Sequence, residues 1–155
     1  MRLDRSWIAA HVPHQGRMCL LDTVLSWDPD SIHCSASSHR LPDHPLRAHG
    51  RLGAACLIEY AAQAMAVHGA LLASSPARAV PAATIGMLAS VRSVELLIGD
   101  LDSITTDLSI RALRQHGDAR GALYEFEVGS DTRVLARGRA SVLLDSAAYG
   151  SRTPA

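Results

Sequence analysis

The amino-acid sequence predicts an α+β fold in which an antiparallel sheet of five or six strands wraps around one long central helix. Residues 53–72 lack proline and are rich in Ala, Leu, Ile and Met, which favours a helix that is apolar nearly all round. Strand-like runs separated by turn signals lie on both sides of this helix. Residues 133–142 largely alternate apolar and polar side chains, which is typical of a strand with one buried face.

The segment before the helix is expected to form a lead-in, a hairpin and a loop. Residues 1–10 favour a short helical or irregular lead-in, and the apolar residues within 18–27 predict a strand. A turn signal at residues 28–30 (DPD) separates that strand from a second one at 31–37. Residues 39–51 are rich in Pro, His, Arg and Gly without apolar periodicity, so we expect a long loop there.

The segment after the helix is expected to form the rest of the sheet. Strands are predicted at residues 84–97, 106–114, 122–128 and 133–144, with turns at 99–100, 116–118 and 129–131. Residues 74–81 are rich in breakers, and residues 146–155 are expected to form a loose tail. The length of 155 residues fits one domain over residues 1–155, with a core at about 12–144.

The composition of the chain argues against several classes of function. Fifteen basic residues match fifteen acidic ones, so there is no net field that would attract nucleic acid or an anionic membrane. Every basic residue is Arg, which excludes Schiff-base chemistry and a P-loop lysine. The long apolar stretch contains Glu59, Gln63 and His68, so we expect a core helix and no membrane span.

The cysteines and the first residues predict a cytoplasmic protein. Cys19, Cys34 and Cys56 are odd in number and lack CxxC spacing, which is more typical of reduced thiols than of disulfides or a zinc site. Charged residues near the start, among them Arg2 and Arg5, interrupt any apolar segment of a signal peptide.

Glu59 is the first candidate catalytic residue, because its neighbours in the predicted helix are mostly apolar. Burial there should raise its pKa and favour the protonated form, which is the form of a general acid. Gln63 lies one helical turn further on and could orient the carboxyl group by a hydrogen bond. The alternative is an ion pair between Glu59 and an arginine of the loop, Arg47 or Arg51.

A base partner for Glu59 must come from another segment, and the loop offers His39, His44 and His49. Their spacing without matching Cys or Asp ligands gives little support to a metal site, and none is expected. Arg40 and Arg47, with Arg51, could meet a phosphate or an acidic protein, or could form a solvated loop.

The start of the predicted helix offers a possible site for a carbonyl oxygen. Backbone N–H groups of the first turn have no partner within the helix, so those from about Gly53 to Cys56 could bind a developing negative charge. Gly53 and Ala54 are therefore candidate substrate-binding residues. Gly53 as a simple helix-entry residue remains an equal alternative.

Three stretches of the chain match motifs of one enzyme family in the same order. Residues 12–22 (VPHQGRMCLLD) combine a Pro-His start with a strand, residues 57–63 (LIEYAAQ) carry Glu and Gln on a helix, and residues 91–101 (VRSVELLIGDL) end in a Gly-Asp turn. Together they resemble the β-hydroxyacyl-acyl carrier protein dehydratases, which have the hotdog fold. The His-Pro-Leu loop and the Ile-Glu-Tyr helix look most like the branch associated with aryl polyene and xanthomonadin-type pathways.

The resemblance implies a lyase that removes water from 3-hydroxyacyl thioesters in fatty-acid-like or aryl polyene biosynthesis. In that family a histidine removes the α-proton and a helix glutamate protonates the departing hydroxyl, and His44 and Glu59 match these positions. Gln63, Gly53 and Ala54 are expected to bind or orient the substrate, and no cofactor is expected. The chain departs from the family pattern at Asp43, at Leu46 and at the helix entry 52–53, and some relatives carry asparagine in place of the histidine.

The resemblance also implies partners. The substrate would be attached to acyl carrier protein through phosphopantetheine, and the protein would form a homodimer, or a heterodimer with a related hotdog subunit. Each active site would then take His44 from one subunit and Glu59 from the other. Two alternatives remain open, a non-catalytic subunit of a heterodimeric dehydratase and a hotdog acyl thioesterase.

Overall fold

The computed structural model describes residues 2–75 and 86–144. These residues form the following elements: α1 (Arg5–His11), η1 (Gly16–Met18), β1 (Thr23–Trp27), β2 (Ser31–Ala36), η2 (Ser38–Arg40), α2 (Cys56–Ala73), β3 (Gly86–Leu96), β4 (Leu108–Gly117), β5 (Gly121–Ser130) and β6 (Arg133–Leu144). The predicted tail at 146–155 and most of the breaker-rich segment at 74–81 lie outside the described residues.

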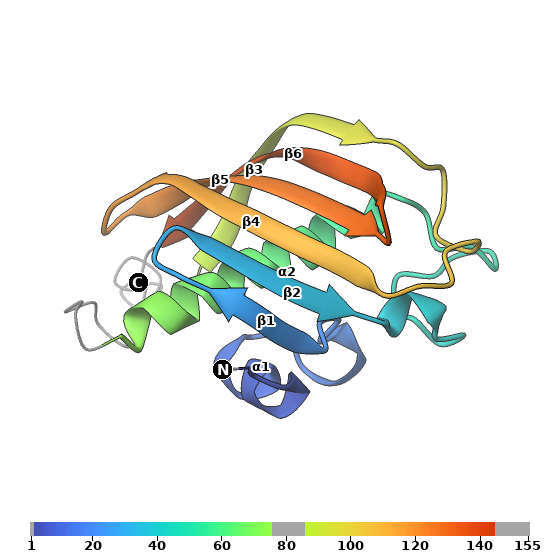
Figure 1. Ribbon diagram of the computed structural model, residues 1–155, viewed down its shortest axis with the longest axis horizontal. Coiled ribbons are helices and arrows are strands. Elements are labelled where there is room, and N and C mark those ends of the chain that lie inside the picture. The colour runs from blue at the N-terminus through green and yellow to red at the C-terminus, as the bar shows by residue number, and fades with distance from the viewer. Residues whose placement is uncertain (1, 76–85, 145–155) are drawn as a thin grey trace, which may run out of the picture.

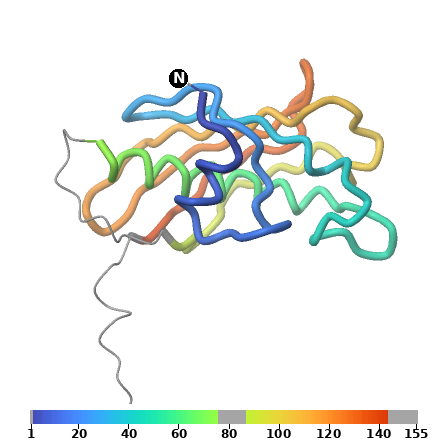
Figure 2. The backbone as a smooth tube through the Cα atoms, turned by 90° about the horizontal axis from the view of Figure 1, so that it is seen from below, coloured from blue at the N-terminus to red at the C-terminus, as the bar shows by residue number. Residues whose placement is uncertain are grey.

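The strands form a single antiparallel sheet in the order β1-β2-β4-β5-β6-β3. The sheet arches over α2, and α1 lies beside β1 (Figure 1). The N-terminal segment crosses α2 on the side away from the sheet (Figure 2). The predicted α+β hotdog architecture, with a sheet around one central helix, is therefore confirmed.

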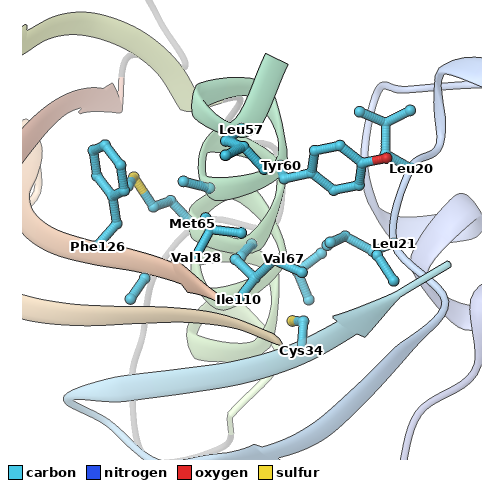
Figure 3. Close-up of a cluster of buried hydrophobic side chains, with 14 of the residues drawn as sticks. Leu20, Leu21, Cys34, Leu57, Tyr60, Met65, Val67, Ile110, Phe126 and Val128 are labelled. Atoms are coloured by element: carbon cyan, nitrogen blue, oxygen red, sulfur yellow. The ribbon is translucent and has the colours of Figure 1, made fainter. Parts of the chain in front are cut away.

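Helix α2 is the centre of the core. Its Met65 and Val67 side chains lie toward the inner face of the sheet, where Val128 is among the facing side chains, while Tyr60 extends toward Leu20 (Figure 3). By length and composition α2 is apolar enough to cross a membrane, but 61% of it is buried inside the protein. This burial is what a core helix requires, since an all-round apolar helix must be covered by other elements.

The first strand is shorter than the predicted strand at 18–27 and begins at Thr23. Leu20 explains the difference, because side chains occupy both of its backbone groups. Its N–H donates to Gln63 Oε1 at 2.9 Å, and its carbonyl oxygen accepts from Ser38 Oγ at 2.8 Å. A backbone bonded to side chains in this way is not available for the ladder of a sheet.

The alternation in β6 has one exception. Leu135, expected on the wet face, is 0% exposed, as is its neighbour Ala136. The register between β5 and β6 shifts next to Val128 and Gly129, and Leu135 has no paired residue in β5. A bulge of this kind turns a side chain away from the regular alternation.

The two edges of the sheet differ. At the β1 edge, Leu3 exchanges two backbone hydrogen bonds with Val24. At the β3 edge, Leu88, Val91 and Leu96 lie opposite the buried residues of β6, so they point to the inner face of the sheet. Their exposed fractions are nevertheless 41%, 36% and 43%. The inner face of β3 is therefore apolar and only partly covered by the rest of the described chain.

Candidate active site

Glu59 lies in the first turn of α2, with its side chain 31% exposed. His14 Nε2 and Gln63 Nε2 both lie 3.1 Å from the same carboxylate oxygen, Oε1. The other oxygen, Oε2, receives no hydrogen bond from the described residues. The carboxylate is thus held by one oxygen and has the other one open.

The pKa of Glu59 lies below its ordinary value. The main cause is the hydrogen bond from His14; partial burial acts in the opposite direction, and the bond from Gln63 adds to the lowering. The expectation of a raised pKa and a protonated Glu59 is therefore wrong for this chain, because two donors stabilise the charged form more than burial disfavours it. Glu59 is held as a carboxylate.

The alternative partners proposed for Glu59, Arg47 and Arg51, lie elsewhere. Arg47 pairs with Asp102 at 2.7 Å, and Arg51 pairs with Asp100 at 2.9 Å. The actual partner is His14, which the sequence interpretation did not assign to the site. The only sequence feature that could have assigned His14 to the site is its place in the VPH motif. The spacing of residues along the chain does not show that this segment contacts the helix.

Gln63 is 0% exposed and its amide is fully used. Oε1 accepts from the N–H of Leu20, and Nε2 donates to the carbonyl oxygen of Met18 at 2.7 Å as well as to Glu59. The expected hydrogen bond between Gln63 and Glu59 is present. Contact of Gln63 with a substrate stays a prediction, since this side chain acts on the site through Glu59.

His44 is 4% exposed and makes hydrogen bonds through both ring nitrogens. The N–H of Leu46 lies 3.0 Å from Nδ1, and the hydroxyl of Tyr60 lies 3.1 Å from Nε2. An amide N–H can only donate, so Nδ1 must carry a lone pair and Nε2 must carry the proton of the neutral ring. Burial lowers the pKa of His44, and the charge of Arg47 acts in the same direction, so the neutral ring is favoured.

The hydrogen bonds from His44 continue through the core to a backbone carbonyl. Tyr60, which accepts from Nε2, lies 2.6 Å from Ser38 Oγ, and Ser38 Oγ donates to the carbonyl oxygen of Leu20. The carbonyl can only accept, so each hydroxyl proton points from Tyr60 toward Leu20. Figure 3 shows the Tyr60 ring extending from α2 toward Leu20. Burial also raises the pKa of Tyr60, which keeps this hydroxyl protonated.

His44 and Glu59 of one chain share no hydrogen bond or ion pair among the described contacts. They are linked indirectly, because Leu20 connects the Ser38 side of one network to the Gln63 side of the other. Two hollows in the described chain, of about 530 and 260 Å³, have neither Glu59 nor His44 in their walls. The first lies on the outer face of the sheet around Arg111 and Arg137.

Only some of the backbone N–H groups at the start of α2 are free to bind a substrate. The N–H of Ala54 donates to the carbonyl oxygen of Gly99 at 3.0 Å, so its backbone donor is not available to a substrate. The N–H groups of Cys56 and Leu57 donate to Gly53 and Ala54. Within the described residues, the N–H groups of Gly53 and Ala55 donate no hydrogen bond. Of the two predicted substrate-binding residues here, Gly53 keeps a free donor and Ala54 does not.

The remaining histidines and arginines of the loop do not gather at Glu59. His39 is 1% exposed, His49 takes a positive φ of 52°, and Arg40 pairs with Asp107 at 2.7 Å. No three His, Cys, Asp or Glu side chains in residues 2–75 and 86–144 are grouped as metal ligands. His68 is buried on α2, bonded to Tyr124 and to the carbonyl of Asp28, as expected for a core histidine.

Comparison with known families places this site in context. A model of the ApeP-like family, described as ApeP dehydratase, matches residues 6–149. The chain belongs to the ApeP-like dehydratase family. This match confirms the predicted enzyme class, a hotdog-fold dehydratase of the aryl polyene branch. No curated protein matches the chain.

Solved structures similar to this ApeP-like chain support the fold. The dehydratase heterocomplex ApeI:P from Xenorhabdus doucetiae matches with a TM-score of 0.76 and 24% identity, over 89% of this chain and 90% of that one. AziG from S. sahachiroi matches with a TM-score of 0.60 and 17% identity, over 82% and 92%. The thioesterase HI1161 from Haemophilus influenzae matches with a TM-score of 0.58 and 9% identity, over 81% and 78%.

Proposed function

We propose that this ApeP-like dehydratase removes water from 3-hydroxyacyl thioesters carried by acyl carrier protein, in the cytoplasm, and that Glu59 is its central catalytic residue. The observation that carries the proposal is the way the Glu59 carboxylate is held. It is fixed through Oε1 by His14 and Gln63, while Oε2 is open toward a substrate. Elimination requires a proton to leave the α-carbon and a proton to reach the departing hydroxyl, and an oriented carboxylate can serve either transfer.

The thioester carbonyl would lie at the start of α2. Removal of an α-proton places negative charge on that oxygen, and backbone N–H groups at a helix start stabilise such charge. Gly53 and Ala55 have N–H groups without a partner in the described chain, so they are the candidate donors. The role of His44 as the base for the α-proton stays a prediction.

The active assembly is proposed to be a dimer, with a second copy or with a related hotdog subunit. Leu88, Val91 and Leu96 leave an apolar face of β3 partly exposed, and a partner helix beneath that face would bury the remainder. Neither of the two hollows described above has Glu59 in its walls, and the acyl group is proposed to occupy a cavity completed by the partner. The similar ApeI:P dehydratase from Xenorhabdus doucetiae is itself a heterocomplex.

The deciding experiment measures dehydration of a 3-hydroxyacyl thioester on acyl carrier protein. The purified chain is assayed alone and together with a related hotdog dehydratase whose own helix carboxylate has been replaced by the amide. Formation of the enoyl product in either assay, and its loss on Glu59→Gln, supports the proposal. Activity that appears only with a partner whose own carboxylate is intact, and that Glu59→Gln leaves unchanged, would identify the chain as a non-catalytic subunit.

The same assay distinguishes hydrolysis from dehydration. Hydrolysis of the thioester releases the free thiol of the carrier, whereas dehydration leaves the thioester intact. Release of thiol at the rate of substrate consumption would assign a thioesterase instead. An ionised Glu59 with an open oxygen is the feature that makes this second outcome worth measuring, because a carboxylate of that kind can also activate water.

A further inference from the structure

The loop between β2 and α2 turns two of its side chains inward. Every residue of the stretch 41–50 is exposed except His44, which is buried, and Arg47, which is half-buried. Two successive turns produce this arrangement. The N–H of His44 donates to the carbonyl oxygen of Leu41 at 3.2 Å, and the N–H of Arg47 donates to the carbonyl oxygen of His44 at 3.0 Å. Arg47 therefore closes the turn that carries His44.

The guanidinium group of Arg47 is held inside the fold. Nη1 lies 2.7 Å from Asp102 Oδ1, Nη2 donates to the carbonyl oxygen of His39 at 3.2 Å, and Nε is buried. The Arg47 side chain is 20% exposed, whereas that of Arg51, in the same loop, is 65% exposed. The partners of Arg47 belong to its own chain, so a second subunit is not needed to form these contacts.

Asp102 belongs to a segment that is fixed to the start of α2 by backbone hydrogen bonds. The N–H of Leu101 donates to the carbonyl oxygen of Leu52 at 2.9 Å, and the N–H of Ala54 donates to that of Gly99 at 3.0 Å. The ion pair between Arg47 and Asp102 thus connects the turn of His44 to the same segment that anchors the helix start.

We infer that Arg47 is a positioning residue for the dehydration, and that its ion pair with Asp102 sets the place of His44 relative to the start of α2. This inference rests on the proposed function. With the thioester oxygen bound at the helix start, the α-carbon lies at a fixed distance from it, so the histidine that removes the α-proton must be held at that distance too. The planar fork of arginine suits this task, because it holds a carboxylate and a carbonyl oxygen at once.

The same contacts argue against direct binding of a phosphate or of an acidic carrier protein by Arg47. Its Nη1 and Nη2 are directed to Asp102 and to the carbonyl of His39, and its Nε is buried. An incoming anion would have to displace the Asp102 carboxylate, which already balances the charge of the guanidinium group. Arg47 therefore acts through the loop and not on the substrate.

Arg47 also affects the proton affinity of His44. Burial is the main cause that lowers the pKa of His44, the charges of Arg47 and His39 act in the same direction, and Asp43 acts in the opposite one. The remaining neighbour, the Tyr60 hydroxyl, is bonded to Nε2. Loss of the Arg47 charge should therefore raise the pKa of His44. Because only the neutral ring can accept a proton, the acidic limb of the kcat/KM profile should move to higher pH.

The test compares Arg47→Gln with Arg137→Gln in the assembly that is active. Arg137 pairs with Glu95 at 3.1 Å on the outer face of the sheet, so this control removes an ion pair away from the helix start. We expect Arg47→Gln to lower kcat by about tenfold to a hundredfold, since misplacing a reacting group by an ångström can cost that much, and to leave KM nearly unchanged. Arg137→Gln should keep both values. A folded Arg47→Gln variant with wild-type kcat would overturn the inference.

A double-mutant cycle with Asp102→Asn tests whether Arg47 acts through this partner. The double variant should lose no more kcat than the weaker of the two single variants, because both substitutions remove the same interaction. Losses that multiply would show that the two residues act independently, against the inference. Arg47→Lys should keep the wild-type pH profile through its charge but regain only part of kcat, because an ammonium group lacks the fork. It also replaces Arg47→Gln in the comparison if circular dichroism shows the latter to be unfolded.

Two substrates separate positioning from binding. Thioesters of 3-hydroxybutyrate with phosphopantetheine and with pantetheine differ only in the phosphate, and Arg47→Gln should reduce kcat equally for both. A rise in KM confined to the phosphorylated substrate would identify a phosphate contact and reject the positioning role.

The chain can also be tested without turnover. In Arg47→Gln, an NMR titration should show a raised pKa of His44, and amide hydrogen exchange should become faster across residues 41–51. If neither changes, the positioning role is wrong, whatever the enzyme catalyses. A wild-type assembly that forms no enoyl product, or whose activity Glu59→Gln leaves intact, would reject the proposed function instead.

Discussion

Two donors converge on one oxygen of Glu59, which makes the two oxygens of the carboxylate chemically different. Oε1 is fixed by His14 and Gln63, and Gln63 is itself fixed by the backbone of Met18 and Leu20. Oε2 is thereby oriented before any substrate binds. Orientation of a reacting group in advance removes entropy that would otherwise be lost in the transition state.

The low pKa of Glu59 predicts the effect of His14→Ala. This substitution removes the main cause of the lowering, and burial then opposes only the bond from Gln63, so the pKa of Glu59 should rise. A carboxylate with a lowered pKa in the folded state stabilises the fold above its unfolded pKa and loses this contribution as the pH falls through the folded value. His14→Ala should therefore be destabilised at neutral pH and should lose less additional stability on acidification than the wild type.

The measurement is a ¹³C NMR titration of the Glu59 carboxyl group, together with urea unfolding from about pH 7 to about pH 3. His14→Gln is the control, because its amide can still donate a hydrogen bond to Oε1. An unchanged titration of Glu59 in the Ala variant would contradict His14 as the cause.

At the level of single residues, the sequence indicated the candidate catalytic side chains but not their protonation states. Glu59 stood out by its apolar neighbours, and His44 by its place in a motif. The partners that set their protonation lie far away in the chain, at His14, Ser38 and Tyr60. Hydrogen bonds between distant segments follow from tertiary packing, which no local pattern specifies.

At the level of elements, periodicity was a good guide where packing follows the local pattern. The helix at 53–72 and the hairpins were predicted close to their observed bounds, because their apolar periods match a buried helix and half-buried strands. The pattern failed at Leu20 and at Leu135. Side chains from other segments occupy the backbone at the first position, and a bulge displaces the second.

The turn between β4 and β5 offers an element-scale prediction, because a glycine lies on each side of it. A Cβ added at Gly121 would lie 2.5 Å from the backbone oxygen of Val142, which cannot move without disturbing the pairing of β5 and β6. A Cβ added at Gly117 would meet the Arg114 side chain, whose flexible end can move away. Gly121→Ala should therefore reduce the free energy of unfolding by about 1–3 kcal/mol, and Gly117→Ala by much less.

Urea unfolding of the two variants, followed by circular dichroism, checks this difference. The comparison is matched because both changes add one methyl group to the same hairpin. Equal losses at the two positions would show that the backbone approach at Gly121 relaxes without cost.

At the level of the whole molecule, the two edges of the sheet differ in whether another segment of the described chain pairs with them. Leu3 pairs with Val24 at the β1 edge, whereas the β3 edge presents exposed apolar side chains on its inner face. An exposed edge strand with apolar neighbours is prone to pair with another strand. Pairing of two β3 edges about a twofold axis would extend the sheet and place a partner helix under that face.

This arrangement predicts the consequence of a charge on the inner face of β3. Val91→Arg places a guanidinium where the partner would bury apolar surface, so the dimer should dissociate at micromolar concentration because an unpaired buried charge is costly. Arg92→Ala on the same strand is the control, because Arg92 lies opposite Arg139 on the outer face and its removal should leave the dimer intact.

Light scattering after size-exclusion chromatography reports the mass, and the dehydration assay reports whether the site needs the partner. Loss of the dimer together with activity in Val91→Arg, with both kept in Arg92→Ala, is the expected result. A wild-type chain that is monomeric and fully active would show instead that one chain forms the complete site.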